Sequence, residues 1–189
     1  VDSVAPVISN CPSDVTLYTN DGSPVNCTRT HTWTEPTAYA NCKGTISYYT
    51  RSHAPGTAFS VGTTTVSYVF RDVDTVITVG STSNDTNYII KSDTCSFNVT
   101  VVDNTNPTIT CPADITNAVT SSNGTGDCST IVHLGNPTPA DNCTVDTVRA
   151  FINGVPLDTT NAVFQKGLTV VTWKVYDTVG NTASCTQRV

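Results

Sequence analysis

Eight cysteines divide the 189-residue sequence into two copies of one pattern. The intervals between successive cysteines are 16, 15 and 53 residues in the first copy and 17, 15 and 42 residues in the second. Other motifs keep this register: ISNCPSDVT from Ile8 matches ITCPADIT from Ile109, and FSVGTTTVSYVFRD from Phe59 matches FQKGLTVVTWKVYD from Phe164. Self-similarity over so long a period indicates repeated structural units. The sequence therefore predicts two tandem domains.

Each copy has the pattern of a β-protein. Val66, Tyr68 and Phe70 fall on one face of an extended segment, and β-branched Val and Thr dominate the whole sequence, which favours strands. No stretch shows a helical period. About seven short strands per copy, separated by frequent turn signals, are typical of an immunoglobulin-like sandwich. We expect an all-β chain of two tandem immunoglobulin-like β-sandwich domains, residues 1–104 and 105–189.

The composition excludes several classes of protein. Only 13% of the residues are charged, and the formal net charge is −6, so a basic surface for nucleic acid is not expected. A coiled coil or helical bundle needs far more Ala, Leu, Glu and Lys. The apolar runs are too short for a membrane-spanning helix. We therefore expect a secreted protein that neither binds nucleic acid nor inserts into a membrane.

Four motifs recur in known extracellular repeats: a Cys-Pro pair near the start, a P-x-x-x-D-N segment, a G-T-T-x-V-x-Y strand, and D-x-x-G-N-x-x-S-C before a last strand. They stand here at Cys11-Pro12 and Cys111-Pro112, Pro137–Asn142, Gly62–Tyr68, and Asp177–Cys185. Together they resemble the hyalin repeat (HYR) domain family over essentially the whole sequence. The resemblance implies a fibronectin-III or immunoglobulin-like sandwich in an extracellular multidomain chain, with a role in adhesion or matrix structure and no enzymatic chemistry.

The first copy departs from this pattern in two places. Tyr39-Ala40-Asn41 lacks the aspartate of the second copy, and 15 extra residues lie between Asp72 and Cys95. The extra residues read as two alternating arms around a polar tip, which predicts a hairpin near residues 75–92. Exposed apolar arms invite pairing with another strand, so we expect a contact with a neighbouring domain or chain, and hence a homopolymer; the alternative is a loop that packs on its own domain. The residues expected at the contact are Val76, Ile77, Val79, Tyr88, Ile89 and Ile90.

An even number of cysteines, four in each copy, indicates disulfides formed in an oxidising compartment. No two cysteines lie closer than 15 residues, which disfavours the paired knuckles of a zinc site. Four cysteines still allow three pairings in each domain. The resemblance implies a bridge between the first and last cysteine of each copy, which leaves the middle two to pair. The expected disulfides are Cys11–Cys95, Cys27–Cys42, Cys111–Cys185 and Cys128–Cys143.

A calcium site is a weaker expectation, and no other cofactor is expected. Asp103, Asn104 and Asn106 lie where the two copies meet and offer the hard oxygen ligands that calcium prefers. Asp72, Asp74 or Asp141 would add further oxygens. The alternative is that these are ordinary turn and linker residues.

Two kinds of glycosylation signal compete. Asn-x-Thr triplets mark acceptors for N-linked sugars in a eukaryotic secretory route. Asp followed by Ser or Thr and then a small aliphatic residue instead resembles a bacterial O-glycan signal, at Ser3, Thr75, Thr147 and Thr178. The sequence does not choose between the two. The N-linked candidates are Asn26, Asn84, Asn98, Asn123 and Asn142.

These features predict a structural or adhesive extracellular or cell-surface module from a longer tandem-repeat fibre, stalk or filament. The equivalence of Val1-Asp2 with Val102-Asp103, and of Val189 with Val99, leads us to expect repeats on both sides. No enzyme is expected, since His31, His53 and His133 lack metal-site spacing and no G-x-S-x-G motif occurs. The alternative function is an adhesin that binds a carbohydrate or protein ligand, with sugar rings stacked on aromatic side chains. The aromatic candidates are Trp33, Tyr39, Tyr48 and Tyr49.

Overall fold

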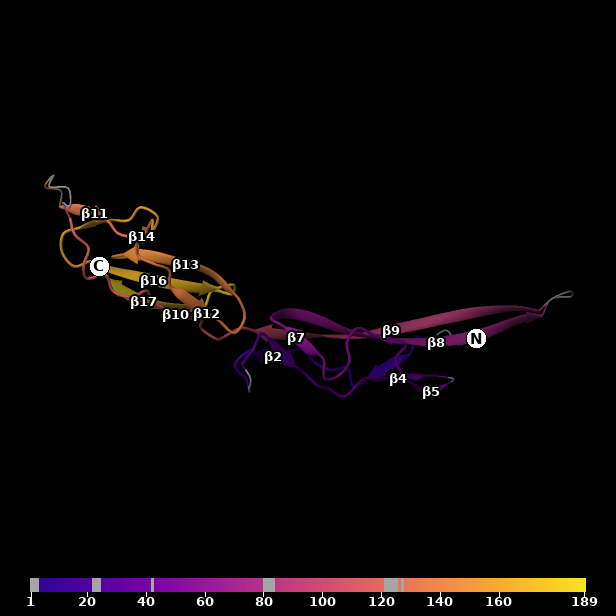
Figure 1. Ribbon diagram of the computed structural model, residues 1–189. Coiled ribbons are helices and arrows are strands. Elements are labelled where there is room, and N and C mark those ends of the chain that lie inside the picture. Colours follow the sequence, from indigo (N-terminus) through magenta and orange to yellow (C-terminus); the bar gives the residue numbers. More distant parts are fainter. Residues whose placement is uncertain (1–3, 22–24, 42, 80–83, 121–125, 127) are drawn as a thin grey trace. The chain divides into compact units, whose positions relative to one another are not determined.

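The computed structural model is all-β and forms two compact units (Figure 1). Unit 1 comprises Val1–Gly22 and Cys27–Val102, and unit 2 comprises Ser23–Asn26 and Asp103–Val189. The structure describes residues 4–21, 25–41, 43–79, 84–120, 126 and 128–189, and the side chains of 76–79 and 84–87 are outside the description. Within these ranges no helix is long and apolar enough to cross a membrane. The prediction of all-β sandwich domains braced by disulfides is confirmed.

The described residues of unit 1 form nine strands in three sheets. One sheet has the order β1-β4-β5, a second has the order β2-β9-β8-β6, and β3 pairs with β7. β8 and β9 are antiparallel from Gly62–Val101 to Val79–Asn84, whereas β2 is parallel to β9. The strands are β1 Val7–Ser9, β2 Val15–Tyr18, β3 Thr28–Thr30, β4 Thr37–Ala40, β5 Gly44–Ile46, β6 Thr50–Arg51, β7 Ala58–Ser60, β8 Gly62–Val79 and β9 Asn84–Val102.

The core of unit 1 forms on one face of the β8–β9 pair. Val66, Tyr68 and Phe70 are each 0% exposed, as the period-2 pattern predicts. Phe97 and Val99 meet them from β9. Side chains of alternate residues share a face, so both strands contribute to one apolar cluster.

Unit 2 repeats this plan, with eight strands in the part of it that the structure describes. The main sheet has the order β14-β13-β16-β17, β10 pairs with β12, and β11 pairs with β15. β16 and β17 are antiparallel throughout, from Val170–Arg188 to Tyr176–Thr182. The strands are β10 Thr108–Thr110, β11 Ser129–Ile131, β12 Thr138–Ala140, β13 Val145–Ile152, β14 Val155–Leu157, β15 Val163–Gln165, β16 Val170–Asp177 and β17 Thr182–Arg188.

A disulfide in each unit joins the segment after the first strand to the last strand. Cys11 pairs with Cys95 at a Cα–Cα distance of 5.7 Å, and Cys111 pairs with Cys185 at 5.8 Å. Both bonds agree with the expected pairing. They close loops of 84 and 74 residues, for which chain-entropy arguments give a stabilisation of about 4–5 kcal/mol each.

The expected Cys128–Cys143 bond is wrong. Cys128 is a free, exposed thiol, whereas Cys143 is disulfide-bonded. The carbonyl of Cys128 accepts a hydrogen bond from Lys166, before the start of β16, and Cys143 is two residues before Val145, which pairs with Asp177 at the other end of β16. An eight-residue strand is about 26 Å long, while a disulfide needs Cα atoms within about 7 Å. For the expected Cys27–Cys42 bond, Cys27 is disulfide-bonded, but Cys42 lies outside the described residues.

The core of unit 2 encloses a polar side chain at the position of Phe97. Gln187 is 0% exposed, and its amide nitrogen donates to the carbonyls of Ala113 and Leu134, both at 2.8 Å. Its amide oxygen accepts a hydrogen bond of 3.1 Å from the indole of Trp173. Buried polar groups are stable when each donor and acceptor has a partner. Gln187 therefore joins three segments of the unit.

Replacing Gln187 by leucine should destabilise unit 2 by about 3 kcal/mol, because the Trp173 indole and two carbonyls would stay buried without partners. Urea denaturation measured by near-UV circular dichroism would detect the loss. The exposed neighbour Arg188 provides a control, as Arg188→Gln should leave the midpoint nearly unchanged. An equal midpoint for Gln187→Leu and wild type would contradict this account of the core.

Candidate functional site

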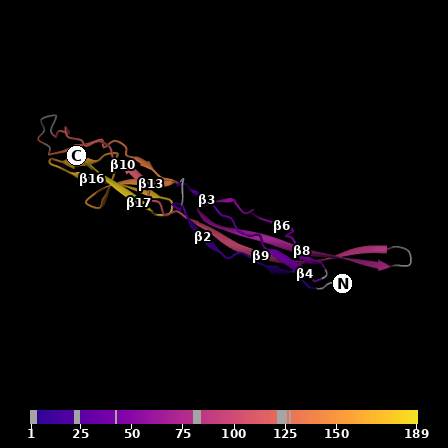
Figure 2. The same ribbon diagram turned by 90° about the horizontal axis from the view of Figure 1, so that it is seen from below.

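The paired ends of β8 and β9 extend past β4 and β5 (Figure 1), and Figure 2 shows the same extension beyond β4. Phe70 is the last residue of β8 that joins the apolar cluster, but the ladder continues to Val79. β6 pairs with β8 only at Tyr68 and Val69, and β2 pairs with β9 only from Val99 onwards. Within the described part of the chain, the outer ladder therefore has no strand on either side.

One face of this outer ladder is apolar and exposed. Val73 pairs with Ile90 and Thr75 pairs with Tyr88, so the four side chains share a face. Val73 is 40% exposed, Ile90 55% and Tyr88 67%. We call Val73, Tyr88 and Ile90 the arm patch. An exposed apolar patch on two paired strands that have no described neighbouring strand is typical of a contact surface.

The six predicted contact residues fall into three groups: those in the arm patch, one on the opposite face, and those whose side chains are not described. Tyr88 and Ile90 lie in the arm patch, whereas Ile89 pairs with Asp74 on the opposite face and is half-buried. The side chains of Val76, Ile77 and Val79 are outside the described residues. Their role in a contact stays a prediction.

The opposite face of the outer ladder is fastened to the sandwich by Lys43. The ammonium group of Lys43, from the β4–β5 turn, forms an ion pair with Asp72 and lies 3.4 Å from the carboxylate of Asp74. It also donates to the carbonyl of Val73. Asp72 is only 2% exposed, and its hydrogen bond raises the pKa of Lys43. This contact could not be predicted from the sequence, because Lys43 and Asp72 are 29 residues apart and no pattern links them.

Replacing Lys43 by glutamine should loosen the base of the outer ladder, because buried Asp72 would lose its cation. Hydrogen exchange at the amides of Thr75 and Tyr88 should become faster. Lys166→Gln, which removes the same charge from unit 2, provides the control. Unchanged exchange rates in the Lys43 variant would show that the ion pair does not hold the ladder.

Two of the four aromatic side chains proposed to stack on sugars belong to the core instead. Trp33 donates a 2.7 Å hydrogen bond to the hydroxyl of Tyr68, and Tyr48 packs edge-on against the same ring. Tyr39 and Tyr49 are 54% and 58% exposed. The guanidinium of Arg71 lies 3.8 Å from the centre of the Tyr49 ring, so this cation occupies one face of the ring.

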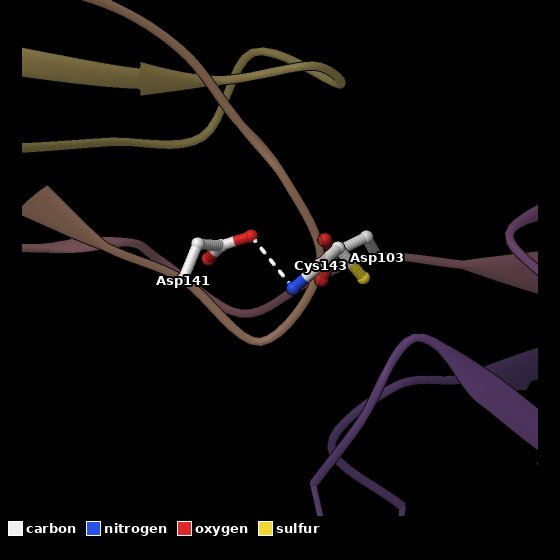
Figure 3. Close-up of side chains that lie close together, drawn as sticks. All are labelled: Asp103, Asp141 and Cys143. Atoms are coloured by element: carbon white, nitrogen blue, oxygen red, sulfur yellow. Dashed lines mark hydrogen bonds between the residues drawn. The ribbon is translucent and has the colours of Figure 1, made fainter.

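An oxygen-rich group lies in unit 2 where the chain enters it (Figure 3). Three potential ligand atoms lie within 4.8 Å of one another: a carboxylate oxygen of Asp103, a carboxylate oxygen of Asp141 and the sulfur of Cys143. Asp103 is 5% exposed and accepts a hydrogen bond from the amide of Thr105. One oxygen of Asp141 accepts from the amide of Cys143 at 2.9 Å. The other Asp141 oxygen and the amide oxygen of Asn142 are buried without a hydrogen-bond partner.

The three predicted calcium ligands do not all join this group. Asp103 lies in it, together with Asp141, whereas Asn104 and Asn106 are exposed. Cys143 cannot act as a thiolate ligand, because its sulfur is in a disulfide. Asp103 and Asp141 thus supply the side-chain oxygens of the group, since the amide nitrogen of Asn142 is the atom that faces Asp103. Calcium takes six to eight oxygens. Backbone carbonyls or water would have to complete the site.

The predicted glycosylation acceptors differ in accessibility. Asn26 is exposed. The amide nitrogen of Asn98 donates to Asp14, and that of Asn142 is 3.5 Å from Asp103. The side chain of Asn84 and the whole of Asn123 lie outside the described residues. Among the described acceptors, Asn26 is exposed, whereas Asn98 and Asn142 are half-buried.

Comparisons with known proteins agree with the fold. A family model of the HYR domain matches residues 1–75. Hyalin from Strongylocentrotus purpuratus is 35% identical over 195 aligned residues, which cover 100% of this chain and 14% of that protein. Hyalin from Lytechinus variegatus is 32% identical over 186 residues, with 98% of this chain and 30% of that protein covered. The chain therefore spans less than a third of the length of either relative.

Proposed function

Because this chain contains an HYR domain and is homologous to hyalin along its whole length, we propose that it is a structural and adhesive extracellular module that joins copies of itself into a fibre. The observation that carries this proposal is the outer β8–β9 ladder. Its arm patch is apolar, its backbone edges face no described strand, and Lys43 holds its base. A ladder held in this way can present one surface repeatedly along a fibre at the cell surface.

The partner that fits the arm patch best is a second copy of the chain. Val73, Tyr88 and Ile90 still expose 40%, 67% and 55% of their surface, so burying the rest gains about half of the roughly 1.5–3 kcal/mol that full burial of an exposed apolar side chain gives. An adjacent ladder also offers matching backbone donors and acceptors for strand addition. Two copies can thus bury their arm patches against each other and pair the backbone edges of their ladders at the same time. Such contacts are individually weak, but they accumulate along a repeated array.

The sugar-binding alternative has less support from the structure. A glycan site would use exposed rings, yet Trp33 and Tyr48 pack in the core and Arg71 covers a face of Tyr49. Tyr18, Tyr39 and Tyr88 remain as exposed rings. A binding module would stay monomeric and respond to a glycan, whereas a fibre module would associate without one.

The double replacement Tyr88→Thr and Ile90→Thr should abolish fibres and leave both units folded, since threonine keeps the strand propensity but removes the apolar area. Electron microscopy and sedimentation would follow assembly, and circular dichroism would check the fold. Ile131→Thr, at a 55% exposed isoleucine of unit 2, provides a matched control that should assemble normally. Fibres of unchanged length from the double variant would refute the role of the arm patch.

Calcium binding at the oxygen-rich group of unit 2 is a second proposal, favoured by the buried, partnerless oxygen of Asp141. A hard cation would satisfy this oxygen together with the carboxylate of Asp103, which lies beside it. Extracellular modules bind calcium at about 0.1–1 mM, so 5 mM calcium, a saturating concentration on that scale, should raise the thermal midpoint of unit 2.

Replacing Asp141 by asparagine should remove this calcium-dependent rise in the midpoint. Asp146→Asn, at an exposed carboxylate four residues before Ala150, should retain it. Differential scanning calorimetry in calcium and in EDTA would make the comparison. Equal midpoints in the two buffers for the wild-type chain would eliminate the site.

A further inference from the structure

The outer face of the main sheet of unit 2 has two cations side by side. β16 lies between β13 and β17 (Figure 1), and Arg149 of β13 is the Cα partner of Lys174 of β16. Trp173 and Val175, on either side of Lys174, are buried, so the two cations lie on the face away from the core. Like charges directly opposite each other on neighbouring strands destabilise a sheet. An anion bound against the pair would remove this repulsion.

No carboxylate among the described residues forms an ion pair with either cation. The ion pairs in the described part of the chain join Lys43 to Asp72 and Asp74, and Arg51 to Glu35, all in unit 1. The whole chain has 15 acidic and nine basic residues, so acidic groups are not scarce. Two adjacent cations without an acidic partner on an acidic chain are available to an anion from outside.

Unit 1 lacks this pair of cations. The matching segments FSVGTTTVSYVFRD and FQKGLTVVTWKVYD make Val69 the equivalent of Lys174. Thr50 pairs with Val69 as Arg149 pairs with Lys174, so both positions are uncharged in unit 1. The shared fold therefore does not require the two charges. Because a rule of sheet stability is broken in one unit alone, binding explains the pair better than folding does.

Hydroxyl groups and an aromatic ring surround the two cations. Ser184 of β17 pairs with Lys174 from the other side, and Thr147 of β13 pairs with Tyr176, two residues along β16. The ammonium group of Lys174 lies 4.9 Å from the centre of the Tyr176 ring, a favourable contact that holds it over this face. We call Arg149, Lys174, Tyr176 and Ser184 the cationic face.

An open hollow of about 480 Å³ adjoins the cationic face, and this volume is within the range of small-ligand sites. Arg149 and Tyr176 line it, together with the turn after β16. Two carboxylates line it as well. Asp177 is 3% exposed and both of its oxygens accept hydrogen bonds from Asn181, whereas Asp146 is exposed. A ligand that has hydroxyl groups beside its anionic group can donate to Asp146, which a simple anion cannot do.

We propose that the cationic face of unit 2 binds a sulfated polysaccharide. A sulfate group lies between Arg149 and Lys174 and accepts charge-assisted hydrogen bonds from both. The sugar ring that bears the sulfate lies in the hollow against Tyr176, and its hydroxyl groups bond with Thr147 and Asp146. The site lies in unit 2 alone and does not depend on the arm patch. It gives a module of a fibre the means to attach to an anionic polysaccharide matrix.

The position of the cationic face within the sheet favours a polysaccharide over an acidic peptide. The backbone of β16 is paired on both sides, with β13 and with β17, so a peptide cannot add a strand here. It would bind through its carboxylates alone. The hydroxyl groups of Thr147 and Ser184 instead match those of a sugar, since both can donate and accept. The Tyr176 ring offers an apolar surface to a sugar ring.

The experiment measures the binding of the 189-residue protein to immobilised dextran sulfate by biolayer interferometry. We expect saturable binding in about 50 mM NaCl that falls steeply toward about 500 mM, because salt screens exposed charges. Arg149→Gln and Lys174→Gln should each weaken the binding by about tenfold, the effect of one charged hydrogen bond. Lys166→Gln, which removes an exposed lysine elsewhere in unit 2, is the control and should bind like wild type.

The choice of polymer separates a polysaccharide site from general attraction of anions. Uncharged dextran of the same length should not bind, and poly-glutamate of equal charge should bind more weakly than dextran sulfate. Poly-glutamate binding as tightly as dextran sulfate would instead indicate an acidic protein partner. Equal weakening by Lys166→Gln and Lys174→Gln would show that net charge alone matters. Either result, or no saturable binding of dextran sulfate, would overturn the proposal.

Circular dichroism of each variant checks that the fold is kept. If one of the two glutamine variants of the cationic face does not fold, the other variant still tests the pair. The comparison of the three polymers uses the wild-type protein and decides the question without any substitution.

Discussion

The antiparallel pairing of the last two long strands is the interaction on which each unit depends. β8 with β9, and β16 with β17, carry the alternating apolar residues that form the cores. The disulfide of each unit fastens this pair to the segment after the first strand. Other strands of both units are as short as two to four residues, and short strands have little stability of their own. They gain their stability by packing on this pair.

Equivalent positions within this shared frame have taken different roles. Asp72 of unit 1 and Asp177 of unit 2 are both buried where the outer strands leave the core. Asp177 accepts hydrogen bonds from the amides of Val179 and Asn181 and so stabilises a tight turn. In unit 1 the turn is replaced by the longer ladder, and Asp72 holds Lys43 instead. The same buried carboxylate thus organises either a turn or the base of a projecting arm.

The sequence was sufficient for the features that repeat, and insufficient for those that depend on one contact. Period-2 alternation located β8 and β16, and the repeated cysteines indicated the first-to-last disulfides, because each signal occurs twice. Spacing alone did not show that Cys128 and Cys143 lie at opposite ends of β16. The contact of Lys43 with Asp72 was missed because the two residues are distant in sequence and no local pattern links them. The calcium prediction named Asp103 and offered Asp141 as one of three further carboxylates, and these two lie together. The other two, Asp72 and Asp74, bind Lys43 instead, and Asn104 and Asn106 are exposed.

The two tryptophans of the chain have a practical consequence, since one lies in each unit. Trp33 donates its indole hydrogen to a phenol oxygen, and Trp173 donates to the amide of Gln187. Both rings pack against the core of their own unit. Their fluorescence is therefore a built-in reporter for each half of the molecule. A Trp33→Phe variant would keep the tryptophan emission of unit 2 alone, and a Trp173→Phe variant would keep that of unit 1. Comparing the melting curves of the two variants would show which unit unfolds first.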